Sequence, residues 1–71
     1  MQEEDESRHR AEVREWIRRR AAMGPLEGKT WLAKVLNDIE RKRGKQAGAR
    51  LRDDIRQQWV AGNRGEPGDW R

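Results

Sequence analysis

The sequence predicts an all-α fold, either a small three-helix bundle or a helical hairpin with one further helix. Three observations favour this class: apolar residues recur at helical spacing in three segments, glycine or proline separates the segments, and no stretch alternates long enough to form a strand. We expect an acidic N-terminal extension at 1–7, a helical domain at 8–61 with helices at about 4–22, 25–43 and 45–61, and an irregular C-terminal tail at 62–71.

The first helix is predicted from one mixed stripe at a spacing of three and four residues. Its members are His9, Val13, Trp16, Ile17 and Arg20. The run Met23-Gly24-Pro25 ends this helix, because glycine frees the backbone and proline sets φ for a new first turn.

The second helix has the clearest amphipathic pattern in the chain. Its apolar stripe consists of Leu32, Val35, Leu36 and Ile39. Gly28 lies on the same face, where a missing side chain lets another helix approach closely. In an alternative interpretation this helix begins only at Thr30, which would serve as the N-cap.

The third helix follows Gly44, which is predicted to end the second one. Its apolar positions recur at spacings of four residues: Ala47, Leu51, Ile55 and Trp59. The stripes of all three helices are thin. Because hydrophobic residues make up only 32% of the chain and charged residues 42%, we expect self-association, as a homodimer, or docking on a partner to complete the core.

Composition excludes several classes of protein and site. There is no cysteine, hence no disulfide framework and no cysteine–zinc site, which fits a cytoplasmic location. No apolar run approaches the ~20 residues of a membrane span, and the acidic start is the opposite of a signal peptide. We expect no cofactor and no metal.

Catalysis is not expected either. His9 is the only histidine, and Ser7 and Thr30 are the only hydroxyl side chains, so no nucleophile with an oriented base is recognisable. Gly28-Lys29-Thr30 matches the end of a phosphate-binding P-loop, but Met23 stands where the first glycine is required and no strand precedes it. A helix-turn-helix centred on Gly44 would place Arg50 and Asp53 at positions that the template needs apolar.

The charge distribution points to an acidic partner. Residues 8–56 carry fifteen Lys/Arg against seven Asp/Glu, and thirteen of the seventeen bases in the chain are arginine. Arg10, Arg14 and Arg18 form a ladder at spacings of four, in which only Glu15 offers Arg18 a neighbouring acid and Arg14 has none. This ladder is the first candidate for a binding surface.

Further candidates lie beside the second turn and on the third helix. Arg41, Lys42, Arg43 and Lys45 surround the Gly44 turn, where they complement the helix dipole or contact phosphate or an acidic protein face. Arg52 and Arg56 form a shorter ladder. Trp16 and Trp59 are expected in the core, whereas Trp31 and the tail residue Trp70 are expected as exposed anchors.

From about Trp31 onward the chain resembles short uncharacterised helical proteins encoded by bacteriophages and prophages. The resemblance covers about residues 31–71 and is carried by Leu32-Ala-Lys-Val35 leading into Arg41-Lys-Arg-Gly44, then Leu51, Ile55 and Trp59, and by the tail from Ala61 to Arg71. It implies no defined activity. It does imply a setting, namely a small phage accessory product that binds and disables a host machine.

The leading hypothesis is therefore a non-enzymatic phage-type protein that inhibits or redirects a host protein complex in the bacterial cytoplasm, with a CRISPR defence system as one such target. Direct binding of DNA or RNA by the same arginines is the alternative, and it would weaken steeply with salt. A virion or scaffold homodimer is a third hypothesis.

Overall fold

The computed structural model describes residues 2–71, with side chains from Asp5 onward, and within them three helices and no strand. The helices are α1 (Gln2–Ala22), α2 (Pro25–Arg43) and α3 (Lys45–Val60). The predicted all-α class is thus confirmed. The acidic start does not form a separate extension, because residues 2–7 are the first turns of α1.

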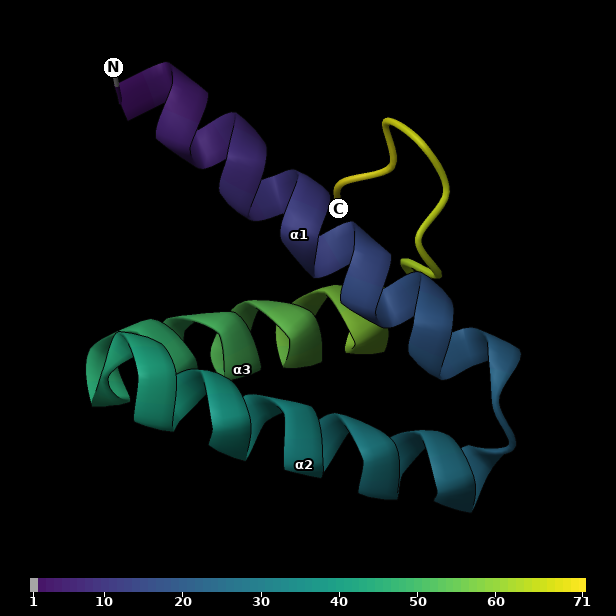
Figure 1. Ribbon diagram of the computed structural model, residues 1–71. Coiled ribbons are helices and arrows are strands. Elements are labelled where there is room, and N and C mark those ends of the chain that lie inside the picture. The colour runs from purple at the N-terminus through teal and green to yellow at the C-terminus, as the bar shows by residue number, and fades with distance from the viewer. Residues whose placement is uncertain (1) are drawn as a thin grey trace.

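The helices are arranged as a hairpin crossed by a third helix (Figure 1). α2 and α3 run side by side in opposite directions, joined at Gly44, and α1 crosses over them. The Cα atoms extend over 37 × 29 × 15 Å, so the bundle is flat. No described helix has both the length and the apolar character that a bilayer crossing requires.

Two glycines explain the positions of these helices. Gly44 has φ +98°, which side chains rarely adopt, so it allows the chain to leave α2 and enter α3 without a longer loop. Gly28 is buried in α2, where a Cβ would stand 2.7 Å from the carbonyl oxygen of Arg20. The predicted close approach at Gly28 is confirmed. α2 begins at Pro25, so Thr30 is not its N-cap.

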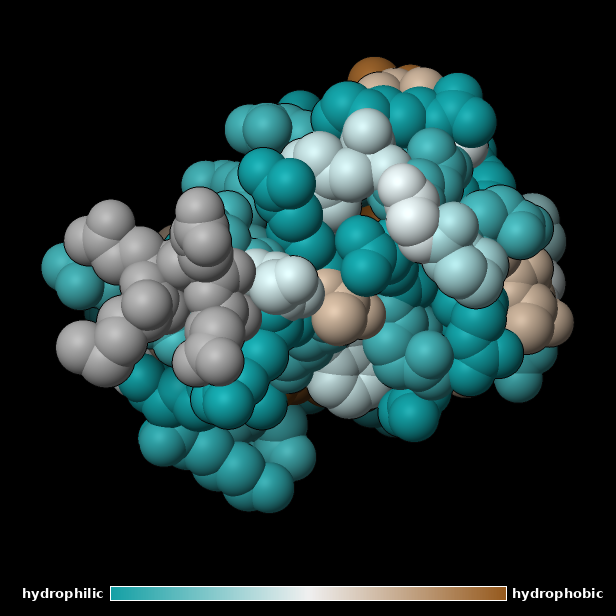
Figure 2. Space-filling model, turned by 90° about the horizontal axis from the view of Figure 1, so that it is seen from above, coloured by the Kyte–Doolittle hydropathy of each residue, from teal (hydrophilic) through white to brown (hydrophobic). Residues whose placement is uncertain are grey.

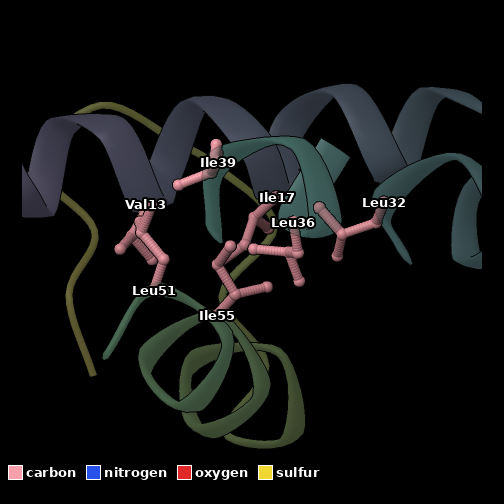
Figure 3. Close-up of a cluster of buried hydrophobic side chains, with 7 residues drawn as sticks. All are labelled: Val13, Ile17, Leu32, Leu36, Ile39, Leu51 and Ile55. Carbon is pink, nitrogen blue, oxygen red and sulfur yellow. The ribbon is translucent and has the colours of Figure 1, made fainter. Parts of the chain in front are cut away.

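The core lies where the three apolar stripes meet (Figure 3). It consists of Val13, Ile17, Leu32, Leu36, Ile39, Leu51 and Ile55, each 7% exposed or less. All four tryptophans pack around it while remaining partly exposed. Trp31 and Trp70 are thus half-buried and not the exposed anchors that the sequence suggested, because Trp31 packs on Trp16 with ring centroids 5.7 Å apart and Trp70 is held against α1 by the tail.

The tail from residue 61 onward is irregular, but it is folded back onto the bundle. Figure 1 shows it returning beside the middle of α1. Gly65 lies directly against this helix, since a Cβ there would stand 2.5 Å from Cβ of Arg18 and 2.7 Å from the carbonyl oxygen of Arg14. Arg10 stacks over the ring of Trp70, 5.2 Å from its centroid. The tail therefore covers part of the flank on which the arginine ladder lies.

Candidate functional site

The sequence-predicted arginine ladder is largely occupied by contacts within the chain. Arg18 donates to both carboxylate oxygens of Glu15, at 3.1 Å and 2.6 Å. Arg10 lies 3.8 Å from Glu6, and only Arg14 has no carboxylate partner within residues 5–71. The expected neighbour of Arg18, Glu15, is thus its partner, and Arg14 has none among the described side chains, whereas Arg10 has a partner in Glu6 that the sequence analysis did not count.

Glu15 is the acid that pairs with two arginines of this flank. It accepts hydrogen bonds from Arg18 and from Arg19, the latter at 2.8 Å, and these bonds lower the pKa of Glu15 from 4.5 to about 2. The same hydrogen bonds raise the pKa of Arg18. Because Glu15 binds both guanidinium groups, an anion that approaches Arg18 or Arg19 has to compete with this carboxylate, although one positive charge of the three groups is left over.

The cluster around Gly44 is also mostly paired. Arg41 and Lys42 lie 2.8 Å and 3.6 Å from the carboxylate of Asp38. Arg43 reaches across to α1, where its Nη1 lies 2.9 Å from Glu12, and this contact raises the pKa of Arg43. Lys45 is exposed and has no such partner among the residues with described side chains.

On α3, the shorter ladder divides into one paired and one exposed arginine. Arg52 lies 3.6 Å from Glu40 on α2, whereas Arg56 is exposed with no carboxylate within reach in the described part of the chain. Arg50, by contrast, is joined to Glu6 of α1 at 2.8 Å. Cross-helix pairs of this kind depend on how helices cross, which the spacing of charges in the sequence does not reveal.

His9, the only histidine in the sequence, has a structural partner. Its Nε2 lies 2.5 Å from Oδ2 of Asp54 on α3, and its side chain is only 10% exposed. His9 therefore joins α1 to α3. No cluster of three or more metal-ligating side chains occurs among the described residues.

Two cations without a carboxylate partner in the described part of the chain lie together at the end of the bundle where α1 stops and α2 begins. The guanidinium carbons of Arg20 and Arg64 lie 4.1 Å and 3.7 Å from the ring centroid of Trp59. No carboxylate with a described side chain forms a salt bridge with either arginine. Burial and then the nearby charge of Arg64 lower the pKa of Arg20.

Three elements and the tail bring this site together. It is an open groove, called the end groove below, lined by Arg20, Ala21, Met23, Pro25, Trp59 and Arg64. α1 supplies Arg20 in its last turn, α3 supplies Trp59, and the close contact at Gly28 holds the start of α2 against Arg20. Arg64 comes from the tail, where its Nη1 donates to the carbonyl oxygens of Trp59 at 2.8 Å and Asn63 at 2.9 Å.

Exposed apolar side chains lie at the same end of the molecule. Leu26 is 83% exposed and Val60 is 79% exposed, and they are the large hydrophobic residues that the described structure leaves most open. Leu26 follows Pro25 of the groove and Val60 follows Trp59. The face that carries α1 and the tail is dominated by hydrophilic side chains (Figure 2). The end groove thus combines two unpaired cations and an aromatic ring, and Leu26 follows Pro25 of its lining, whereas Val60 lines a separate hollow with Arg56 and Ala61.

The sequence analysis did not identify this site, although one signal was present. Arg20 continues the buried stripe of the first helix, and no acid stands three or four positions from it. Trp59 was placed in the core and Arg64 in an irregular tail, so nothing in the pattern linked the three. Their meeting depends on the path of the tail.

Comparison with known proteins shows a match to a protein family. A model of a family of unknown function (DUF7696) matches residues 1–62, a stretch that includes all three helices. No curated protein and no solved structure matches the chain.

Proposed function

The chain belongs to the DUF7696 family of unknown function, and we propose that it is a non-enzymatic binding protein whose end groove holds an acidic segment of a partner protein. The observation that carries this proposal is the placement of Arg20 and Arg64 over Trp59 without a carboxylate partner among the described side chains. Two guanidinium groups close together repel each other, and this repulsion is relieved when an anion binds between or beside them.

The chemistry of the groove favours a protein segment over nucleic acid. Phosphate backbones are held by several cations along a track, whereas Arg10, Arg18 and Arg19 on α1 and Arg41, Lys42 and Arg43 at the Gly44 turn are paired within the chain. Leu26 and Met23, beside or within the groove, suit apolar side chains of a partner. Tryptophan and arginine are also the residues that dominate binding energy at protein interfaces.

The test is binding of a short labelled peptide of alternating aspartate and leucine, followed by fluorescence anisotropy. The double variant R20Q/R64Q is expected to bind it about tenfold or more weakly, since a hydrogen bond to a charged group makes a net contribution of roughly 1.5–3 kcal/mol. The matched control, R41Q/R56Q, removes the same charge outside the groove and should bind like the wild type. If both double variants bound the peptide equally weakly, the loss of affinity would come from the change in net charge alone, and the proposal would be contradicted.

The biological setting that we propose is inhibition or redirection of a host protein complex in the bacterial cytoplasm by a phage-type product, an anti-CRISPR activity being one form. The resemblance of residues 31–71 to phage-encoded helical proteins supports this setting. Affinity capture from a bacterial lysate, with and without nuclease, tests it. Protein captured equally under both conditions is expected, and capture that disappears with nuclease would favour direct DNA or RNA binding.

We also propose that the protein forms a homodimer, because its core is small and Leu26 and Val60 are exposed. Light scattering at two concentrations should then give a mass that rises toward twice 8.4 kDa. The double variant L26S/V60S should stay at the mass of one chain. A constant monomer mass for the wild type would contradict the dimer without affecting the proposed binding role.

A further inference from the structure

The C-terminal tail is held in place by the two buried polar side chains of the described structure. Gln58 is 4% exposed and Asn63 is fully buried. Gln58 binds both backbone groups of Arg71, since its Nε2 donates to the carbonyl oxygen at 2.5 Å and its Oε1 accepts from the backbone N–H at 2.7 Å. The last residue of the described chain is thereby fixed to α3.

Asn63 fixes the beginning of the same segment. Its Nδ2 donates to Oε1 of Gln58 at 3.1 Å and to the carbonyl oxygen of Asp69 at 2.9 Å, and its Oδ1 accepts from the backbone N–H of Gly65 at 2.8 Å. Buried polar groups with all their hydrogen bonds made specify one arrangement, because any other arrangement leaves them unsatisfied. The tail therefore has a single docked position.

Arg64 stands between two of these fixed points. Asn63 precedes it, and Gly65, which follows it, is pressed against α1 at Arg14 and Arg18. Beyond its stacking on Trp59, the guanidinium of Arg64 donates only to the backbone carbonyls of residues 59 and 63 within the described part of the chain. Its place in the end groove depends on the docked tail.

We propose that Gln58, Asn63 and Gly65 are positioning residues for the end groove, so that docking of the tail and capture of the acidic segment form one coupled equilibrium. This inference rests on the proposed function. With the tail docked, Arg64 and Arg20 both lie against the ring of Trp59 and the groove is complete. With the tail released, only Arg20 remains, and the flank of α1 under Gly65 is uncovered. A ligand that binds the complete groove must stabilise the docked tail to the same extent.

Two glycines of the tail offer a matched pair of variants. A methyl group at Gly65 would collide with α1, 2.5 Å from Cβ of Arg18 and 2.7 Å from backbone atoms of Arg14 and Arg18, whereas Gly68 has no neighbouring atom within 4 Å of its Cβ position. Both have positive φ, at +90° and +77°, so G65A and G68A share the backbone strain and differ in the collision. Q58L provides a second way to release the tail without touching α1.

The experiment measures tail docking and peptide binding in the same samples. Amide hydrogen exchange at Gly65 and Arg71, followed by NMR, reports docking, because both N–H groups are bonded to the buried side chains. G65A and Q58L should exchange fast at Arg71 and bind the aspartate–leucine peptide about tenfold more weakly, the factor expected when about a tenth of the molecules hold Arg64 in place. Far-ultraviolet circular dichroism checks that the helices persist in each variant.

G68A should keep slow exchange and wild-type binding. Adding the peptide should slow amide exchange at Arg71 further in the wild type but not in R64Q. A tail that only stabilises the fold would show no response of this exchange to the peptide in either protein. Wild-type affinity in G65A or Q58L, together with fast exchange at Arg71, would overturn the coupling while leaving the proposed function intact. Peptide binding that does not respond to R20Q/R64Q would instead overturn the proposed function itself.

Discussion

The backbone of Arg20 and the Cα of Gly28 are in such close contact that no side chain fits between them. A Cβ on Gly28 would stand 2.7 Å from the carbonyl oxygen of Arg20 and 3.1 Å from its Cγ. This contact places the end of α1 on the start of α2. It therefore determines both the packing of the first two helices and the position of Arg20 in the end groove.

The variant G28A should be destabilised by about 1–3 kcal/mol, the usual cost of forcing additional atoms into a packed contact. The helix preference of alanine over glycine offsets part of this cost. G24A is the control, because Gly24 has an ordinary extended conformation and open space around it, and it should remain within about 0.5 kcal/mol of the wild type. Urea denaturation followed by circular dichroism measures both, and equal stabilities would contradict the close packing.

Ile17 has no exposed surface and lies at the centre of the core. I17A should lower the free energy of unfolding by about 2–5 kcal/mol, because it removes buried methylene groups and leaves a cavity. V60A removes atoms from a side chain that is 79% exposed and should change stability by less than about 0.5 kcal/mol. The thermal midpoint of each variant provides the comparison, and a small loss for I17A would argue against this core.

Asp54 should contribute more to stability than its neighbour Asp53, although the two acids are adjacent in sequence. Asp54 accepts from His9 at 2.5 Å, while Asp53 is exposed with no hydrogen bond or ion pair among the described contacts. D54A leaves the largely buried His9 ring without its partner and should cost about 1–3 kcal/mol. D53A should be close to neutral. The reverse order of stabilities in guanidinium unfolding would exclude the bond between α1 and α3.

Acid should weaken the α1 flank in a defined pH range. The pKa of Glu15 is about 2 in the folded chain, lowered from 4.5 by hydrogen bonds from Arg18 and Arg19. A carboxylate with a depressed folded pKa adds stability that is present above its unfolded pKa and is lost as pH falls toward the folded one, here between about 4.5 and 2. E15Q should therefore show a shallower loss of stability over this range, while E27Q, at an exposed position of α2, should follow the wild type. An NMR titration of the Glu15 carboxyl that gives an ordinary pKa would refute the prediction.

The helices could be predicted because their signals are local. The stripe of Leu32, Val35, Leu36 and Ile39 has the helical period, and Gly24, Pro25 and Gly44 mark the breaks. Even the role of Gly28 follows from its place on the buried face. Such signals depend only on residues a few positions apart, and the helices that they predict are kept when the helices pack together.

The site could not be predicted, because it depends on contacts between residues far apart in sequence. Arg43 pairs with Glu12 and Arg50 with Glu6 only because α1 crosses the hairpin at a particular angle. The turn-forming residues after Ala61 indicate an irregular segment, and they carry no information about the surface on which it lies. Arg64 therefore gave no sign that it would reach Trp59.

The path of the tail also has a consequence for the order in which the molecule assembles. α2 and α3 are joined directly at Gly44, so their association closes only a short loop and costs little chain entropy. The contact of Gly65 with Arg18 and that of Trp70 with Arg10 close loops that span most of the polypeptide, and the entropy cost of such closure grows with loop length. The hairpin is thus expected to form early in refolding, and the last residues to attach only once the rest is native.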